Sequence, residues 1–167
     1  TLLNAHRDLP KARLDTYIGK TIDQICDCGF GTPGDVHNHC AHFVSHVMDY
    51  TFGTVCTAMT AKNPATAGRG RTIRVNDIFN NCPTRGNWDD KPDSLYYCLI
   101  FAVHSSGVQA TNPITITDQR RKHVGIYVNG DCYNYHNTTN EAVRSDGVSR
   151  FRNLYGSGTR VLYASFP

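Results

Sequence analysis

The order of the predicted elements indicates an α+β domain, with helices in the first third of the chain and antiparallel strands in the second half. Apolar residues recur at helical spacing between Pro10 and Ile25 and again after His39. Beyond Tyr96 the apolar runs are short and strand-like, and Asn129-Gly130 predicts a two-residue hairpin turn. The 167 residues, of which 40% are hydrophobic and 19% charged, suffice for one domain with a buried core.

The first helix is predicted over residues 10–25. Proline suits the first turn of a helix. Pro10 is followed at helical spacing by Leu14, Ile18, Ile22 and Ile25.

A second helix is predicted to begin near His39, with Asn38 as its N-cap. Its apolar stripe consists of Phe43, Val44, Val47 and Met48. Cys40 falls in the first turn, where the backbone N–H groups are unpaired and the helix dipole is positive.

The remaining elements are mainly strands. Residues 63–71 predict a loop, and residues 75–79 a short helix or turn. Strands are expected at 96–103, 114–117, 122–128 and 131–136, a short helix around 149–155 and a last strand at 160–165.

Composition and charge set outer bounds on function. The net charge of +3 suits a polyanionic partner but does not require one. No nucleic-acid motif is present, so we expect no nucleic-acid partner. No apolar run is long enough to cross a bilayer, so we expect a soluble domain without stable membrane insertion.

The seven cysteines have two interpretations. One reactive thiol and six partners allow three disulfides and an oxidising destination. Buried free thiols are the alternative, and Cys98 and Cys132 suit it because both lie in apolar strand patterns.

Cys40 and His123 are the candidate nucleophile and general base. A thiol at a helix start, beside an imidazole, is placed to lose its proton and attack a carbonyl. The backbone N–H of Cys40 is the expected oxyanion donor, with Tyr17 as a weak second candidate. His104, at the end of the 96–103 run, is a lesser candidate for the base.

A third group should orient the imidazole of His123. Counting back from the Asn129-Gly130 turn places His136 opposite His123, and Asn134 opposite Gly125. Asn134 and His136 therefore share the face of His123, and both are candidates. We interpret the Asn137-Thr138-Thr139 glycosylation sequon as a chance match.

Two stretches carry a resemblance to a known family. Residues 31–47, GTPGDVHNHCAHFVSHV, resemble the Gly-rich approach and nucleophile helix of NlpC/P60 and CHAP cysteine peptidases. Residues 123–130, HVGIYVNG, are similar to their second signature, with its hairpin. His39 stands where that family usually has Asp. The Cys-x-His-Phe-Val sequence is closer to the lecithin:retinol acyltransferase branch of the same superfamily. In that branch the two motifs occur in the reverse order, so the order found here favours hydrolysis over acyl transfer.

The resemblance implies a single catalytic domain over residues 1–167. Its fold would be papain-like, with N-terminal helices and the nucleophile helix packed on a C-terminal antiparallel sheet. It would cleave amide bonds in peptidoglycan stem peptides through a thioester, with a polar His, Asn or Gln as third residue. A secreted or periplasmic antibacterial effector of this kind would have an immunity or inhibitor protein as partner. An alternative that keeps the same thiol chemistry is a thiol acyltransferase or lipid hydrolase.

The histidines near Cys40 suggest a non-enzymatic alternative. His39, His42 and His46 lie on one predicted helical face, where they can hold Zn²⁺ together with Cys40 or Asp35. A thiol–imidazole pair needs no ion, so the enzyme interpretation expects no cofactor or metal. Two basic stretches flank the predicted site and suit carboxylates of a peptide. They are Arg69, Arg71 and Arg74, and Arg120, Arg121 and Lys122.

Overall fold

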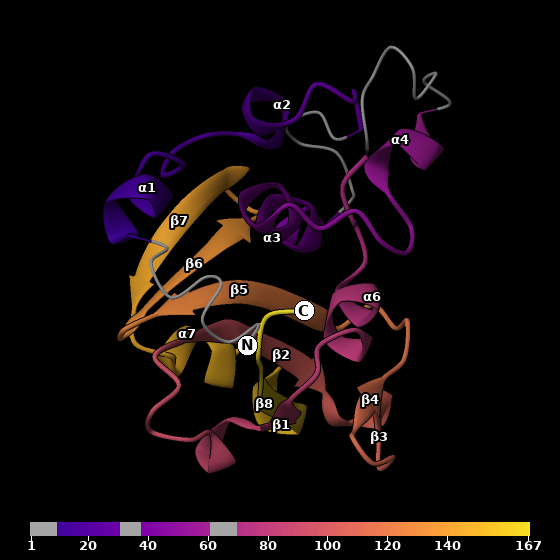
Figure 1. The fold of residues 1–167 in the computed structure, drawn as a ribbon, viewed down its shortest axis with the longest axis vertical. Coiled ribbons are helices and arrows are strands. Elements are labelled where there is room, and N and C mark those ends of the chain that lie inside the picture. The colour runs from indigo at the N-terminus through magenta and orange to yellow at the C-terminus, as the bar shows by residue number, and fades with distance from the viewer. Residues whose placement is uncertain (1–9, 31–37, 61–69) are drawn as a thin grey trace.

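A computed structural model describes residues 10–30, 38–60 and 70–167. The fold is α+β, as the sequence predicts, and is built around a six-stranded antiparallel sheet in the order β1-β8-β2-β5-β6-β7 (Figure 1). Those strands are β1 (Arg85–Asn87), β2 (Tyr97–His104), β5 (Lys122–Val128), β6 (Asp131–His136), β7 (Glu141–Asp146) and β8 (Thr159–Ala164). A separate two-stranded sheet joins β3 (Val108–Gln109) to β4 (Thr115–Ile116).

The helices are short and lie on both faces of the sheet. They are α1 (Lys11–Asp15), α2 (Ile22–Ile25), α3 (Cys40–Met48), α4 (Cys56–Met59), α6 (Val75–Asn80) and α7 (Ser149–Arg152). Helix α3 packs on β5 and β6. Figure 1 shows α7 on the other side of these strands, and α2 and α4 beyond α3, at the end of the molecule away from the sheet. None of the described helices is both long and apolar enough to cross a membrane.

Two apolar clusters sandwich the sheet. The larger one lies on the α3 side and contains Phe43 and Val44 of α3 together with Val124 and Ile126 of β5. The smaller one lies on the α7 side and is centred on Phe151. Because side chains alternate along a strand, neighbouring residues of β5 belong to different layers.

The hairpin of β5 and β6 follows the predicted register. Asn129 and Gly130 both have positive φ, +42° and +97°, as the mirror-image turn requires. Val128 pairs with Asp131 and Ile126 with Tyr133. Both strands have the residue bounds that the sequence indicated.

The predicted helix over residues 10–25 is wrong, because the chain turns between α1 and α2. Gly19 has a φ of +82°, a conformation that ends a helix and favours glycine. Its N–H donates to the carbonyl of Ala142 on β7, and the N–H of Ala142 donates to Lys20. Ile18, counted as part of the apolar stripe, is 41% exposed. Backbone pairing with a strand of the sheet therefore replaces the middle of the helix.

Several other elements differ from expectation. Strands β1 and β7 and helix α4 were not predicted, and the helix expected at 149–155 ends at Arg152. The Gly-rich approach over residues 31–37 and most of the loop expected at 63–71 lie outside the described residues.

All seven cysteines are free and buried, as the second interpretation of their number held.

Candidate active site

The start of α3 is held by two asparagine side chains. Asn38 Oδ1 accepts a hydrogen bond from the N–H of Cys40 at 3.0 Å, and Asn137 Oδ1 accepts one from the N–H of His39 at 3.1 Å. The N-cap position is His39 rather than Asn38. The N–H of Cys40 is therefore already paired and is not the free oxyanion donor that we expected. The side chain of Asn137, the first residue of the sequon, therefore contributes to the fold.

The thiol of Cys40 lies against the backbone of β5. The backbone N–H groups of Val124 and Ala41 lie near it, and Cys40 is 1% exposed. Burial raises the pKa of this thiol to about 11, although the two N–H groups act in the opposite direction. The resting sulfur is therefore a neutral thiol. This corrects the expectation that the helix start favours a thiolate, because desolvation outweighs the helix dipole here.

His123 is hydrogen-bonded to Asn134, one of the two residues that the sequence offered to orient its imidazole. Nε2 of His123 lies 3.0 Å from Oδ1 of Asn134. An amide oxygen only accepts, so Nε2 carries the proton and Nδ1 keeps a lone pair. Burial lowers the pKa of His123 to about 4. The imidazole is therefore neutral at pH 7 and able to act as a base.

The other two histidines near this strand have different surroundings. His136 is half-buried at the end of β6 opposite Glu141, and no hydrogen bond joins it to His123 within the described chain. Burial, then Arg150 and His123, lower its pKa to about 4. His104 Nδ1 is bonded to Ser106 Oγ at 2.7 Å. Tyr17 packs edge-on against Phe43, where its ring is part of the core.

Cys40 and His123 meet at β5 from different sides. Cys40 belongs to the apolar cluster that contains Val124, whereas the ring of His123 lies 5.4 Å from that of Phe151 on the α7 side. The thiol lies near the backbone of Val124, the residue next to His123, and no direct hydrogen bond between the Cys40 and His123 side chains is present in the described part of the chain. Burial raises the pKa of Tyr155, which packs with Phe151, and a thiolate at Cys40 would raise it further.

A pocket of about 510 Å³ opens beside Cys40. Asn38, Ile73 and Val75 line it together with three cations, Arg74, Arg120 and Lys122. Asp118 bridges Arg74 and Lys122 at 2.8 Å each. Arg120 is exposed and has no ion pair with any described residue. The fold therefore brings one cation of the first basic stretch, Arg74, and two of the second, Arg120 and Lys122, together beside the candidate nucleophile.

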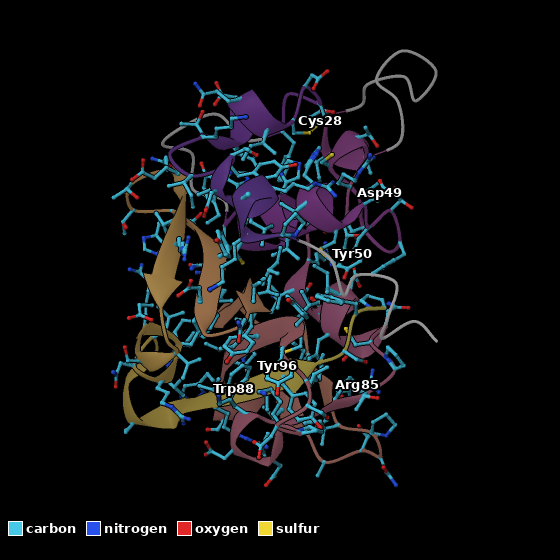
Figure 2. All side chains as sticks on the ribbon, turned by 60° about the vertical axis from the view of Figure 1, so that its left-hand side comes forward. Cys28, Asp49, Tyr50, Arg85, Trp88 and Tyr96 are labelled. Carbon is cyan, nitrogen blue, oxygen red and sulfur yellow. The ribbon has the colours of Figure 1, made fainter. Side chains whose placement is uncertain are left out.

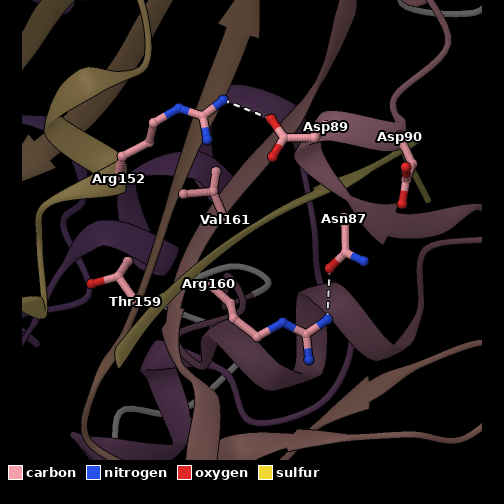
Figure 3. A pocket seen from close by; sticks show the side chains of 7 residues that line it. All are labelled: Asn87, Asp89, Asp90, Arg152, Thr159, Arg160 and Val161. Atoms are coloured by element: carbon pink, nitrogen blue, oxygen red, sulfur yellow. Dashed lines mark hydrogen bonds and ion pairs between the residues drawn. The ribbon is translucent and has the colours of Figure 1, made fainter. Parts of the chain in front are cut away.

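A second pocket, of about 420 Å³, lies on a different part of the surface (Figure 3). Its two arginines already have partners. Arg152 pairs with Asp89 at 2.8 Å, and Arg160 donates to Asn87 Oδ1 at 2.6 Å. Neither a thiol nor an imidazole lines this pocket, so it cannot support the thiol–imidazole chemistry that the sequence predicts.

A separate group of possible metal ligands lies elsewhere on α3. One ligand atom each from Cys26, His42, His46 and Cys56 fall within 4.8 Å of one another. Of the ligands considered from the sequence, His42 and His46 belong to this group, whereas His39 and Cys40 do not, and Asp35 lies outside the described residues. Sequence reasoning missed Cys26 and Cys56, because thirty positions separate them and neither lies in a Cys-x-x-Cys pair.

Comparison of the chain with protein-family models, curated proteins and solved structures finds no match in any of the three. Function must therefore be argued from the geometry of the site itself.

Proposed function

We propose that the protein is a thiol-dependent amide hydrolase resembling NlpC/P60 peptidases, with Cys40 as nucleophile and His123 as general base. The observation that carries this proposal is the hydrogen bond from His123 Nε2 to Asn134, which leaves Nδ1 with a lone pair on the residue next to Val124, whose backbone lies near the thiol. The packing of α3 on β5 and β6 supports a papain-like arrangement, in which the nucleophile helix lies on the sheet that carries the base.

In the proposed reaction, His123 Nδ1 takes the thiol proton as the sulfur attacks the amide carbon. The carbon–nitrogen bond then breaks, and the imidazolium gives its proton to the departing amine. Water, deprotonated by His123, attacks the resulting thioester and releases the acid, and the sulfur recovers its proton. Asn134 keeps the Nε2 proton in place throughout, so Nδ1 is always the nitrogen that exchanges protons.

The reaction requires the two side chains to come closer. Proton transfer needs Nδ1 within about 3 Å of the sulfur, and catalytic contacts are often longer without substrate. Because Cys40 packs on the α3 side of β5 and His123 on the α7 side, the proposal requires the start of β5 to rearrange when substrate binds. Displacing Asn38 from the N–H of Cys40 would free that donor for the developing oxyanion.

The pocket beside Cys40 favours an anionic substrate. Arg74, Arg120 and Lys122 line it, and only Asp118 pairs with any of them among the described residues. Stem peptides of peptidoglycan carry free carboxylates that these cations would attract.

Mass spectrometry of muropeptides after incubation with the protein tests the proposal. We expect a new amine and a new carboxylate at one stem-peptide bond, and no cleavage by Cys40→Ala. Cys132→Ala is the matched control, since Cys132 is equally buried but lies on the other face of the sheet. Cleavage by Cys40→Ala at the wild-type rate would refute the assignment. An acylated Cys40 after incubation with phospholipid would favour the alternative.

A further inference from the structure

The end of the molecule beyond α3 is built from very small elements. Helices α2 and α4 have four residues each, too few to be stable by themselves. Their shared apolar cluster consists of Cys26, Cys28 and Cys56, with Phe30 and Ile73 packed against it. Figure 2 shows Cys28 at this end of the molecule, far from Trp88 and Tyr96 at the other. So small a core needs a further restraint to fix the two helices on α3.

Four ligand atoms converge there from three helical elements. Cys26 directly follows α2, Cys56 begins α4, and His42 and His46 lie one turn apart on α3. The Sγ atoms of Cys26 and Cys56 are 3.9 Å apart, far beyond the length of a disulfide bond. Two thiolates on one tetrahedral zinc ion, each at about 2.3 Å, would be separated by roughly 3.8 Å.

Three of the four ring nitrogens of His42 and His46 have no hydrogen-bond partner among the described residues. Both ring nitrogens of His42 are buried without a hydrogen-bond partner among the described residues, and so is Nε2 of His46. His42 is completely buried. Leaving such nitrogens unpaired in the interior is unfavourable, and a bound cation would satisfy one on each ring.

The two sulfurs receive the backbone hydrogen bonds that accompany metal-bound thiolates. The N–H of Cys28 donates to Cys26 Sγ at 3.4 Å, and the N–H of Arg71 donates to Cys56 Sγ at 3.3 Å. Such outer contacts orient the ligands and stabilise their negative charge. Two thiolates and two neutral imidazoles around a divalent cation also give a site without net charge, which suits its burial.

We propose that Cys26, His42, His46 and Cys56 bind one Zn²⁺ ion in a tetrahedral site that fixes α2 and α4 to the nucleophile helix. Zinc is the divalent ion that such a mixed sulfur and nitrogen set selects. Four protein ligands close the coordination sphere, so the ion stabilises structure rather than activating water. This inference does not rest on the proposed hydrolase activity.

The test measures metal content and metal geometry in untagged protein. We expect about one zinc per chain, and chelator treatment should lower Tm by roughly 5 °C or more. Replacing zinc by Co²⁺ should give the visible absorption of a tetrahedral ion and a sulfur-to-cobalt charge-transfer band. Cys26→Ser and the half-buried His46→Gln should each lose most of the bound zinc. Cys132→Ser and His104→Gln, which change the same residue types elsewhere, should keep it.

Wild-type protein alone can overturn the proposal, even if a ligand variant fails to fold. Metal-free wild-type protein that takes up no Zn²⁺ or Co²⁺ on titration would do so. A Cys26–Cys56 disulfide in zinc-free purified protein would do so as well, and so would zinc content unchanged in both ligand variants. Cys40→Ala should retain its zinc whether or not it retains activity, so failure of the hydrolase proposal is distinguishable from failure of this one.

Discussion

At the scale of single residues, Asn134 decides which nitrogen of His123 can act. We expect Asn134→Ala to lower kcat about tenfold, since it removes one buried hydrogen bond worth roughly 1.5 kcal/mol in positioning. Asn134→Asp should raise the pKa of His123 and move the acid limb of the pH–rate profile upward, an effect that a purely structural residue would not have. His136→Ala is the control and should change kcat less than threefold. Equal losses in Asn134→Ala and His136→Ala would contradict the assignment of Asn134.

His123 also predicts a pH dependence of stability. Its pKa is about 4 in the folded protein against an ordinary 6.5, so the unfolded chain binds this proton more readily between those values. The free energy of unfolding should therefore fall as pH decreases from 6.5 to 4, by at most about 3 kcal/mol from this residue. Urea unfolding of wild type and His123→Gln across this range measures it, because only the wild type contains this group. Stability curves that stay parallel would show that His123 is not buried in its neutral form.

At the scale of elements, strand prediction succeeded where side-chain alternation and turn chemistry agree. The Asn129-Gly130 turn fixed the register of β5 and β6, and with it the shared face of His123 and Asn134. Helix prediction failed over residues 10–25, because Gly19 pairs with Ala142 on a strand that the sequence did not indicate. A spacing of apolar residues shows which side chains can share a face. It does not show that the backbone between them forms one helix.

Gly125 on β5 is predicted to be required for the packing around His123. A Cβ there would lie 2.9 Å from Phe151 Cζ and 3.2 Å from Asn134 Cβ. We expect Gly125→Ala to lower the free energy of unfolding by about 1–3 kcal/mol and to lower kcat by moving Asn134. Chemical denaturation measures the first effect and steady-state kinetics the second.

A smaller side chain at Phe151 provides the control for that prediction. Phe151→Leu frees space beside Gly125, so the double variant Gly125→Ala/Phe151→Leu should lose less stability than the sum of the two single variants. Strictly additive losses would mean that the contact between these two positions is not the cause.

At the scale of the whole molecule, the sequence indicated candidate residues that lie in compact motifs and missed those that the fold assembles. Cys40, His123 and Asn134 lie in short runs with recognisable spacing. Cys26 and Cys56 meet only because α2 and α4 both pack near α3, and Arg74 reaches Arg120 only through the placement of α6 beside β4 and β5. Such pairings depend on the tertiary path of the chain, which local periodicity does not contain. For the same reason, the possible metal ligands in the structure include Cys26 and Cys56 in place of His39 and Cys40.

The assembled charge at the pocket gives a prediction about substrate recognition. Arg120 is the pocket cation without an ion pair among the described residues. Arg120→Glu should therefore raise KM for a carboxylate-bearing stem peptide about fivefold, because it removes roughly 1 kcal/mol of attraction between exposed charges. The value of kcat should stay close to that of wild type. Added salt should diminish the difference, because exposed charges are screened. Arg121→Glu makes the same change of charge one position further along, where the residue is exposed but does not line the pocket. If Arg121→Glu raises KM as much as Arg120→Glu, the overall charge of the protein attracts the substrate, and the pocket beside Cys40 does not select it.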